Sequence, residues 1–353
     1  MNVHILAVAL LAGALSLTAC SGGGGGSSQT GQVPQPQFSR EAATTTNSQA
    51  IQSAGNSAAT NLPRFGSVTQ SSNAGSVSGV TGDAVSTSFN GREARLTIRR
   101  TDGSRLSFNG ATDRIGSVVY DPIVPGYTFR GDGMLKQTAT SVSVAAVYTN
   151  WNNADPNDYL AGGYWMHVTG STSPPAVTGA EIGAFVDGPE LRGPSTRPTT
   201  GTATYTGSAA GFYAYRSAQN VQIGEFGGVA SLTADFGANT ISGCIGCNGG
   251  VNVSGIDADT NGRVTEFVNV NVPVRVRMST ASIGGDGTFR NQRVSLERDD
   301  ATVTSTSGSW GGRFSTIQSG GEPRLVAGTA GARWTESTGA QGVFAGAWYA
   351  VKR

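Results

Sequence analysis

From about residue 75 onward, the sequence consists of short runs of alternating apolar and polar residues, separated by Gly, Asp-Gly and Pro. Alternation with a period of two places every second side chain on one face of a strand, and the separating residues are typical of tight turns. The runs Leu96–Ile98 and Leu106–Phe108, for example, flank the turn dipeptide Asp102-Gly103. This pattern predicts an all-β protein built from hairpins.

The cleanest alternation lies between residues 270 and 277. Because Pro273 has no N–H to donate, we expect it at an edge or a bulge within this strand. A closed antiparallel barrel suits such strands, because closure gives each one an inside and an outside and removes unpaired edges. Side chains predicted to face the core are followed here by those predicted to face solvent: Val270, Val272, Val274 and Val276, then Asn271, Pro273, Arg275 and Arg277.

The chain has 353 residues, enough for two modest domains with real cores. A proline-rich stretch over residues 189–198 has neither strand nor helix character, and it predicts the boundary between them. We therefore expect a β-rich domain over residues 75–198 and a closed barrel over residues 199–353.

The N-terminus predicts export and lipid attachment. The apolar run over residues 5–19 is too short to span a bilayer as a helix and has the length of a signal core, although no Lys or Arg precedes it. The segment Leu17–Cys20 resembles the lipobox of bacterial lipoproteins, which implies removal of residues 1–19 and attachment of fatty acyl chains such as palmitate at Cys20. Ser21 follows in place of the aspartate that retains such lipoproteins at the inner membrane. We therefore expect a lipid-anchored protein of the outer membrane, exposed at the cell surface.

Residues 20–74 are rich in Gly, Ser, Gln and Thr and poor in bulky apolar side chains. A segment of this kind buries too little apolar surface to offset the entropy of ordering. We expect a disordered tether with a root-mean-square span of roughly 35 to 40 Å, which would hold the folded part clear of the lipid.

Charge and cysteine content limit the classes of function. Charged residues make up only 13% of the chain and the net charge is +1, so no basic face predicts nucleic-acid binding. Cys244 and Cys247 remain as a pair in an oxidising compartment, which predicts a disulfide. Their spacing also fits a redox motif, but the helix context of such motifs is missing.

An ordered set of glycine-rich segments occupies the last 150 or so residues: Gly201–Gly207, Leu232–Gly237, Ile241–Gly243, Gly308–Phe314, Val326–Thr329 and Gly342–Trp348. This set resembles the β-barrel domain of the transferrin-binding protein B family, which includes factor H-binding protein. The resemblance implies a surface lipoprotein with a lipidated N-terminus, a glycine-rich anchor, a β-rich handle domain and a C-terminal eight-stranded antiparallel barrel. It also implies a macromolecular partner, with an iron- or haem-carrying protein as one candidate, and it transfers no contact residue.

Few residues suggest catalysis or metal binding. His167 is the one histidine left after signal removal, which excludes zinc sites built on paired histidines, and no nucleophile elbow accompanies it. We therefore predict no enzymatic activity, no metal and no cofactor. The half-motif Asp257–Gly262 matches the start of a calcium loop, but Val268 stands where the bidentate glutamate belongs, so an exposed turn is the simpler interpretation.

Two polar segments could form recognition loops. The first runs from Trp151 to Tyr159 and places aromatic anchors among polar residues, with His167 in the following strand as a third candidate binding residue. The second is the charge cluster Glu297–Asp300, which also fits a solvated hairpin tip.

Together these observations predict a non-catalytic binding protein, held at the outer membrane by its lipid, that presents loops to a macromolecular partner. A carrier that encloses a small hydrophobic ligand inside the barrel is the alternative. An integral membrane barrel fits less well, because a lipid anchor would be redundant and no outward apolar band with aromatic girdles is evident.

Overall fold

Strands make up most of the described chain, and no α-helix is found there. The computed structural model describes residues 38–41, 46–51, 72–74, 85–90, 93–99, 104–120, 129–138, 141–151, 159–172, 175–187, 191, 195–218, 220–259 and 264–353. The expected signal peptide and Cys20 lie outside these residues. The prediction of an all-β fold is confirmed.

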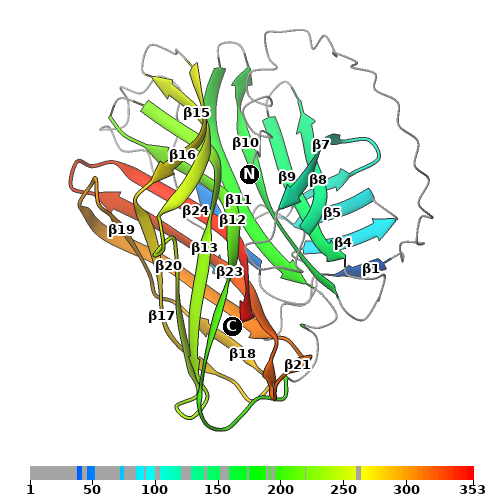
Figure 1. Ribbon diagram of the computed structural model, residues 1–353. Helices are drawn as coiled ribbons and strands as arrows, with labels where there is room; N and C mark the ends of the chain where they lie inside the picture. The colour runs from blue at the N-terminus through cyan, green and yellow to red at the C-terminus, as the bar shows by residue number, and fades with distance from the viewer. Residues whose placement is uncertain are drawn as a thin grey trace, which may run out of the picture.

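The C-terminal part is a closed antiparallel barrel of eight strands, as predicted (Figure 1). It closes because the first strand pairs with the second along one edge and with the last along the other. A ninth segment, β19 (Val294–Arg298), extends the wall beside β17. In order around the barrel the strands are β12 (Thr202–Arg216), β13 (Asn220–Asp235), β14 (Thr240–Ile245), β17 (Val274–Ile283), β18 (Thr288–Asn291), β20 (Val303–Phe314), β23 (Leu325–Glu336) and β24 (Gln341–Lys352).

The N-terminal part is the expected β-rich handle and contains two sheets. In the larger sheet the order is β3 (Ser72–Ala74), β2 (Thr46–Ile51), β11 (Pro175–Asp187), β10 (Tyr159–Thr172), β9 (Ser141–Trp151), β8 (Phe129–Gln137) and β7 (Arg114–Tyr120). In the smaller sheet it is β1 (Phe38–Glu41), β4 (Val85–Asn90), β5 (Glu93–Arg99) and β6 (Arg105–Asn109). The predicted hairpin is present in the smaller sheet, where Leu96 pairs with Phe108 and Ile98 with Leu106.

Three of these strands fall within the segment that the sequence predicts to be a tether. β1 pairs with β4, β2 with β11 and β3 with β2, so each adds to a sheet made by later strands. The edge of a sheet offers unpaired N–H and C=O groups, and a segment can therefore join it without large apolar side chains. Composition alone misses this kind of pairing.

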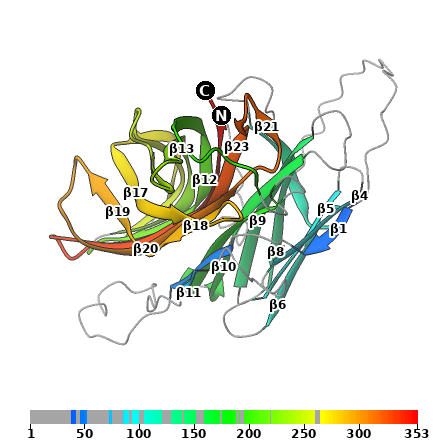
Figure 2. The ribbon, with the colours of Figure 1, turned by 90° about the horizontal axis from the view of Figure 1, so that it is seen from below.

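The protein has three layers: the smaller sheet, the larger sheet and the barrel (Figure 2). Adjacent residues of β10 point to opposite faces of the larger sheet. Trp165 packs with Leu96, Ile98 and Phe108 between the two sheets. Tyr164 points the other way, and its ring meets the Phe212 ring of the barrel wall edge-on at 4.9 Å between centroids. Handle and barrel therefore share one apolar core.

A buried carboxyl group lies in this shared core. Glu225 of β13 is only 5% exposed, and its neighbours are apolar. Ile223 lies two residues earlier on the same strand, and Phe212 lies on the adjacent strand. Burial raises the pKa of Glu225 to about 8, and the nearby Tyr164 hydroxyl of the handle is the smaller, opposing cause. The carboxyl group is therefore mostly protonated at neutral pH.

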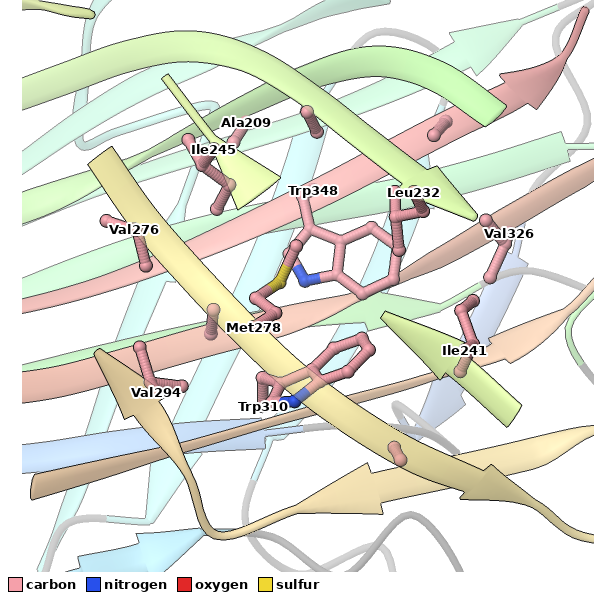
Figure 3. Packing of buried hydrophobic residues seen from close by; sticks show 14 of the residues in the cluster. Ala209, Leu232, Ile241, Ile245, Val276, Met278, Val294, Trp310, Val326 and Trp348 are labelled. Carbon is pink, nitrogen blue, oxygen red and sulfur yellow. The ribbon is translucent and has the colours of Figure 1, made fainter. Parts of the chain in front are cut away.

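The barrel interior is filled by aromatic and aliphatic side chains over most of its length. Trp310 and Trp348 lie 6.2 Å apart between ring centroids, and Met278 and Leu232 pack around them (Figure 3). Glycines of neighbouring strands make room for such rings, because a Cβ on Gly328 would overlap the Trp348 ring. An eight-stranded barrel is of the size that side chains just fill.

The predicted strand through residues 270–276 is two strands in the structure. β16 (Val264–Val272) ends just before Pro273, and β17 begins just after it. Pro273 therefore separates the strands and does not lie within one, because it cannot donate a ladder hydrogen bond. The alternation is kept within β17, where Val276 is buried and Arg277 is exposed, but the prediction that Val270 faces the core is wrong, because Val270 lies exposed on β16.

Candidate functional site at the barrel mouth

One end of the barrel is closed and the other is hollow. At the closed end the rings of Tyr205, Phe236 and Phe314 pack together. At the end where β12 turns into β13 and β23 into β24, a hollow opens to solvent; we call this end the barrel mouth. Its lining residues are Tyr213, Tyr215, Gln222, Phe226, Val251, Val253, Val272, Val274, Val276, Leu296, Arg298, Trp334 and Phe344.

Aromatic rings form one wall and the floor of the mouth. Tyr213 and Tyr215 stand two residues apart on β12, so both point inward. The Tyr215 ring stacks on Trp334 at 6.3 Å between centroids. Phe226 and Phe344 meet edge-on at 5.7 Å. Because aromatic pairs prefer these offset and edge-on arrangements, the wall is well ordered without filling the mouth.

A buried carboxylate holds this wall in place. Glu336 accepts hydrogen bonds from Tyr215 Oη at 3.0 Å, from Trp334 Nε1 at 3.2 Å and from Arg298 Nη1 at 2.9 Å. Arg298 also binds both carboxylate oxygens of Asp300, at 2.9 and 2.7 Å, and lies over the Tyr215 ring. The bond to Asp300 raises the pKa of Arg298 further above its ordinary value. These charges are satisfied by one another and fix the geometry of the mouth.

Two oxygen atoms near the mouth have no hydrogen-bond partner among the described residues. Tyr213 is only 8% exposed, and its hydroxyl is buried and unpaired. Asp257 accepts from Asn220 Nδ2 at 2.8 Å and Gln222 Nε2 at 3.1 Å through Oδ2, whereas its Oδ1 is buried and unpaired. Burial chiefly, and then the charge of Asp257, raise the pKa of Tyr213, so the two groups share one environment.

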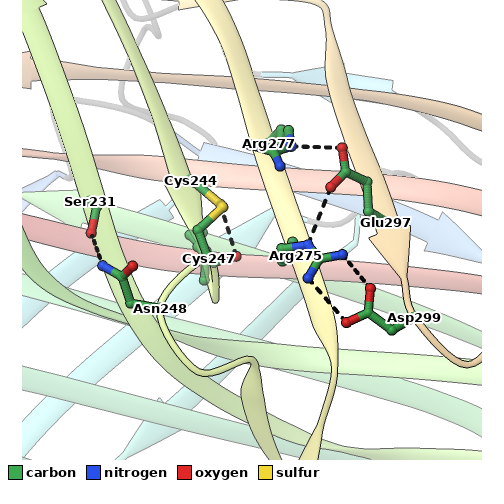
Figure 4. Close-up of a disulfide and its surroundings, with 9 residues drawn as sticks. Ser231, Cys244, Cys247, Asn248, Arg275, Arg277, Glu297 and Asp299 are labelled. Atoms are coloured by element: carbon green, nitrogen blue, oxygen red, sulfur yellow. Dashed lines mark hydrogen bonds and ion pairs between the residues drawn. A yellow bond between two sulfur atoms is a disulfide. The ribbon is translucent and has the colours of Figure 1, made fainter.

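A hairpin, β15 (Val251–Asp259) and β16, forms the other wall. β13 pairs with β14 along its second half and with β15 along its first half. The turn between β14 and β15 contains the Cys244–Cys247 disulfide, with Gly246 and Gly250 at positive φ (Figure 4). The disulfide therefore lies at the point where the chain leaves the barrel ring and enters the hairpin.

The hairpin exposes apolar side chains. Val268 and Val270 on β16 are 42% and 44% exposed, and the third large apolar side chain exposed to this degree in the described chain is Ile115 on β7. β16 pairs only with β15 among the described strands, and a bulge opposite Ser254 places Asn269 at positive φ. Bulges of this kind twist an edge strand and interrupt its pairing surface.

The charge cluster Glu297–Asp300 is not a simple solvated tip. Glu297 accepts from Arg277 Nε at 2.6 Å and from Arg275 Nε at 3.3 Å, and Arg275 also binds Asp299 (Figure 4). These pairs cross from β17 to β19 on the outer face of the barrel. Arg298 and its partner Asp300 belong to the mouth, so the alternation of the strand divides the cluster between two faces.

The candidate binding residues of the handle do not form one site. Trp151 and Tyr159 pair with one another at the ends of β9 and β10, and residues 152–158 between them lie outside the described residues. His167 is buried and its Nδ1 lies 2.7 Å from Ser143 Oγ. It is eight residues along β10 from Tyr159, which corresponds to about 26 Å.

The half-motif Asp257–Gly262 begins in β15, and residues 260–263 lie outside the described residues. Within the described chain, no group of three or more His, Cys, Asp or Glu side chains could hold a metal ion. The described residues likewise include no helix able to cross a bilayer.

Sequence reasoning did not identify the mouth as a site, although Arg298 falls within the candidate segment Glu297–Asp300. Tyr213 and Tyr215 alternate with Ala214, and Arg298 continues the inward series of Val294 and Leu296. Both signals have a period of two and are visible in the sequence. They indicate a shared site only once it is known that these strand ends lie together at one rim of the barrel.

Comparison with known proteins gives little guidance. No protein-family model and no curated protein matches the chain. One similar solved structure is a protein of unknown function from the DUF3598 family of Nostoc punctiforme, at 9% identity and a TM-score of 0.19, covering 90% of this chain and 96% of that one. A likeness this weak carries no argument about fold or function.

Proposed function

We propose that the protein is a non-catalytic binding protein, anchored by lipid at Cys20 to the outer membrane, that recognises a macromolecular partner through the β15–β16 hairpin beside the barrel mouth. The observation that supports this proposal best is the exposure of Val268 and Val270 on one edge strand beside the hollow. Exposed apolar side chains next to a concave, aromatic-lined surface are typical of binding sites.

The arrangement of the layers also supports a binding role. The handle and the barrel share one apolar core, so the mouth is presented by a scaffold with little freedom to bend. Rigid scaffolds that carry recognition segments bind with a smaller loss of entropy than flexible ones. An iron- or haem-carrying protein, the partner class implied by the resemblance to transferrin-binding protein B, is the first to test.

The test compares matched surface variants in affinity capture. The double variant Val268→Asn, Val270→Thr removes the exposed apolar side chains of β16, and Ile115→Thr removes an equally exposed one from the handle. Each protein is immobilised, exposed to host or environmental fluid, and the retained proteins are identified by mass spectrometry. We expect the hairpin variant to lose a partner that the wild type and Ile115→Thr retain. Equal retention by all three would refute the hairpin as the recognition surface.

Surface exposure is tested separately by protease treatment of intact cells. A protein at the cell surface would be cleaved, whereas one facing the periplasm would be protected until the outer membrane is opened.

A further inference from the structure

The lining of the barrel mouth has the character of a small-molecule site. This is a second binding role, distinct from recognition of a macromolecule by the hairpin. The mouth is a hollow that is partly open to solvent, and its enclosed part is small. Its walls are valines and leucine on one side and aromatic rings on the other. Small-molecule sites are lined mainly by apolar and aromatic side chains of this kind.

The Tyr213 hydroxyl supplies the polar group that orients a ligand in such a site. It lines the hollow, is more than nine-tenths buried and has no hydrogen-bond partner among the described residues. Asp257 Oδ1 is a second buried oxygen without a partner there, and its charge acts on Tyr213. Buried polar groups in native proteins are nearly always paired, so the unpaired Tyr213 hydroxyl, which lines the hollow, is a group with which a ligand can pair.

The charges around the mouth indicate which ligands are excluded. Arg298 is the cationic residue of the lining, and Asp300 and Glu336 already occupy its guanidinium group. Asp257 adds a further negative charge. An anionic ligand would therefore meet net repulsion, whereas a hydroxyl or N–H group could donate to one of the unpaired oxygens.

We propose that the barrel mouth binds a small, uncharged aromatic molecule that carries one hydroxyl or N–H donor. The rings pack between Trp334 and Tyr215 on one side and Val253 and Val274 on the other. The polar group forms a hydrogen bond with Tyr213. The occupant is a free small molecule, because the buried hydroxyl lies inside the mouth and the exposed apolar side chains of the hairpin lie outside it.

The test uses two probes of the same size, 1-naphthol, which has a hydroxyl, and 1-methylnaphthalene, which has none. The protein is the mature chain with Cys20→Ala and its disulfide intact, so that no detergent is needed. Dissociation constants are measured by fluorescence titration. We expect saturable 1:1 binding of 1-naphthol, an affinity about fivefold lower in Tyr213→Phe, and no loss of affinity for 1-methylnaphthalene in that variant. The anion 1-naphthalenesulfonate should bind at least tenfold more weakly than 1-naphthol.

Two further variants locate the site. Val253→Phe fills the mouth and should abolish binding of both neutral probes. Tyr205→Phe removes a buried hydroxyl at the closed end of the same barrel, where it donates to the Pro323 carbonyl, and should leave binding unchanged. The thermal unfolding of each variant is recorded, so that a loss of binding is not confused with a loss of fold.

The absence of saturable 1-naphthol binding to the wild type would overturn the proposal. So would equal affinities of the wild type and Tyr213→Phe for 1-naphthol, or unchanged binding in a folded Val253→Phe variant. The double variant Val268→Asn, Val270→Thr should keep full 1-naphthol binding, so this proposal and the proposed macromolecular function can fail independently.

Discussion

Because of Glu225, we expect the free energy of unfolding of this protein to fall as the pH rises from acidic to neutral. Its carboxyl group lies between the barrel wall and the handle, where burial raises its pKa from an ordinary 4.5 to about 8. The perturbation that tests this is Glu225→Gln, which keeps the shape of the side chain but cannot ionise.

The sign follows from proton binding. Between pH 4.5 and 8 the unfolded chain has lost the proton from this carboxyl group, whereas the folded protein retains it. Stability is therefore full below about pH 4.5, falls as the pH rises, and becomes level above about pH 8. One pKa unit is worth about 1.36 kcal/mol, so the whole loss is about 5 kcal/mol, of which about 3.5 kcal/mol falls between pH 5 and pH 8.

The assay is urea unfolding at pH 5 and pH 8, followed by tryptophan fluorescence because Trp165 reports on the handle and Trp348 on the barrel. The wild type should lose about 3.5 kcal/mol more than Glu225→Gln across this interval. Glu266→Gln removes an exposed carboxyl group on β16 and should follow the wild type. Parallel pH profiles for the wild type and Glu225→Gln would refute the reasoning, as would a wild type that gains stability relative to this variant.

Four other perturbations test the fold and the anchor. Gly342→Ala places a methyl group against the Trp334 ring and should cost about 1 to 3 kcal/mol by chemical unfolding, whereas Gly285→Ala, which points into open space, should cost little. Glu336→Ala leaves Arg298 without its buried partner and should cost about 3 kcal/mol; a loss below 1 kcal/mol would show that Glu336 does not organise the mouth. Replacing both Cys244 and Cys247 by serine should cost about 2 kcal/mol, because the closed loop is short, and should speed amide hydrogen exchange mainly in the β14–β15 turn. Cys20→Ala should move the protein from the membrane fraction to the soluble fraction, and continued sedimentation with membranes would contradict lipid anchoring.

The sequence predicts the strands of this protein better than it predicts how those strands pair. Alternation with turn residues was enough to predict an all-β fold and a barrel, because each inward residue needs an apolar environment whatever its neighbours are. The pairings of β1, β2 and β3 could not be predicted, since an edge strand is held by backbone hydrogen bonds that leave no mark in composition.

The mouth was missed for a related reason. Tyr213, Arg298 and Trp334 lie far apart in the sequence, and only the closure of the barrel brings their strand ends to one rim. Conversely, the segment around Trp151 and Tyr159 was prominent in the sequence because its polar and aromatic residues are contiguous. Contiguous features are easy to detect, whereas a site assembled from eight strands is not.

Because β13 pairs first with one strand and then with another, the shape of the barrel does not depend on the hairpin that varies beside it. Because one continuous strand supports both β14 and β15, the circumference of the barrel is set without the hairpin, and the hairpin is attached to one supporting strand. Its length and sequence can therefore change while the number of strands and their tilt stay the same. We expect proteins with this topology to diverge first in the β15–β16 hairpin, while the barrel strands stay the same.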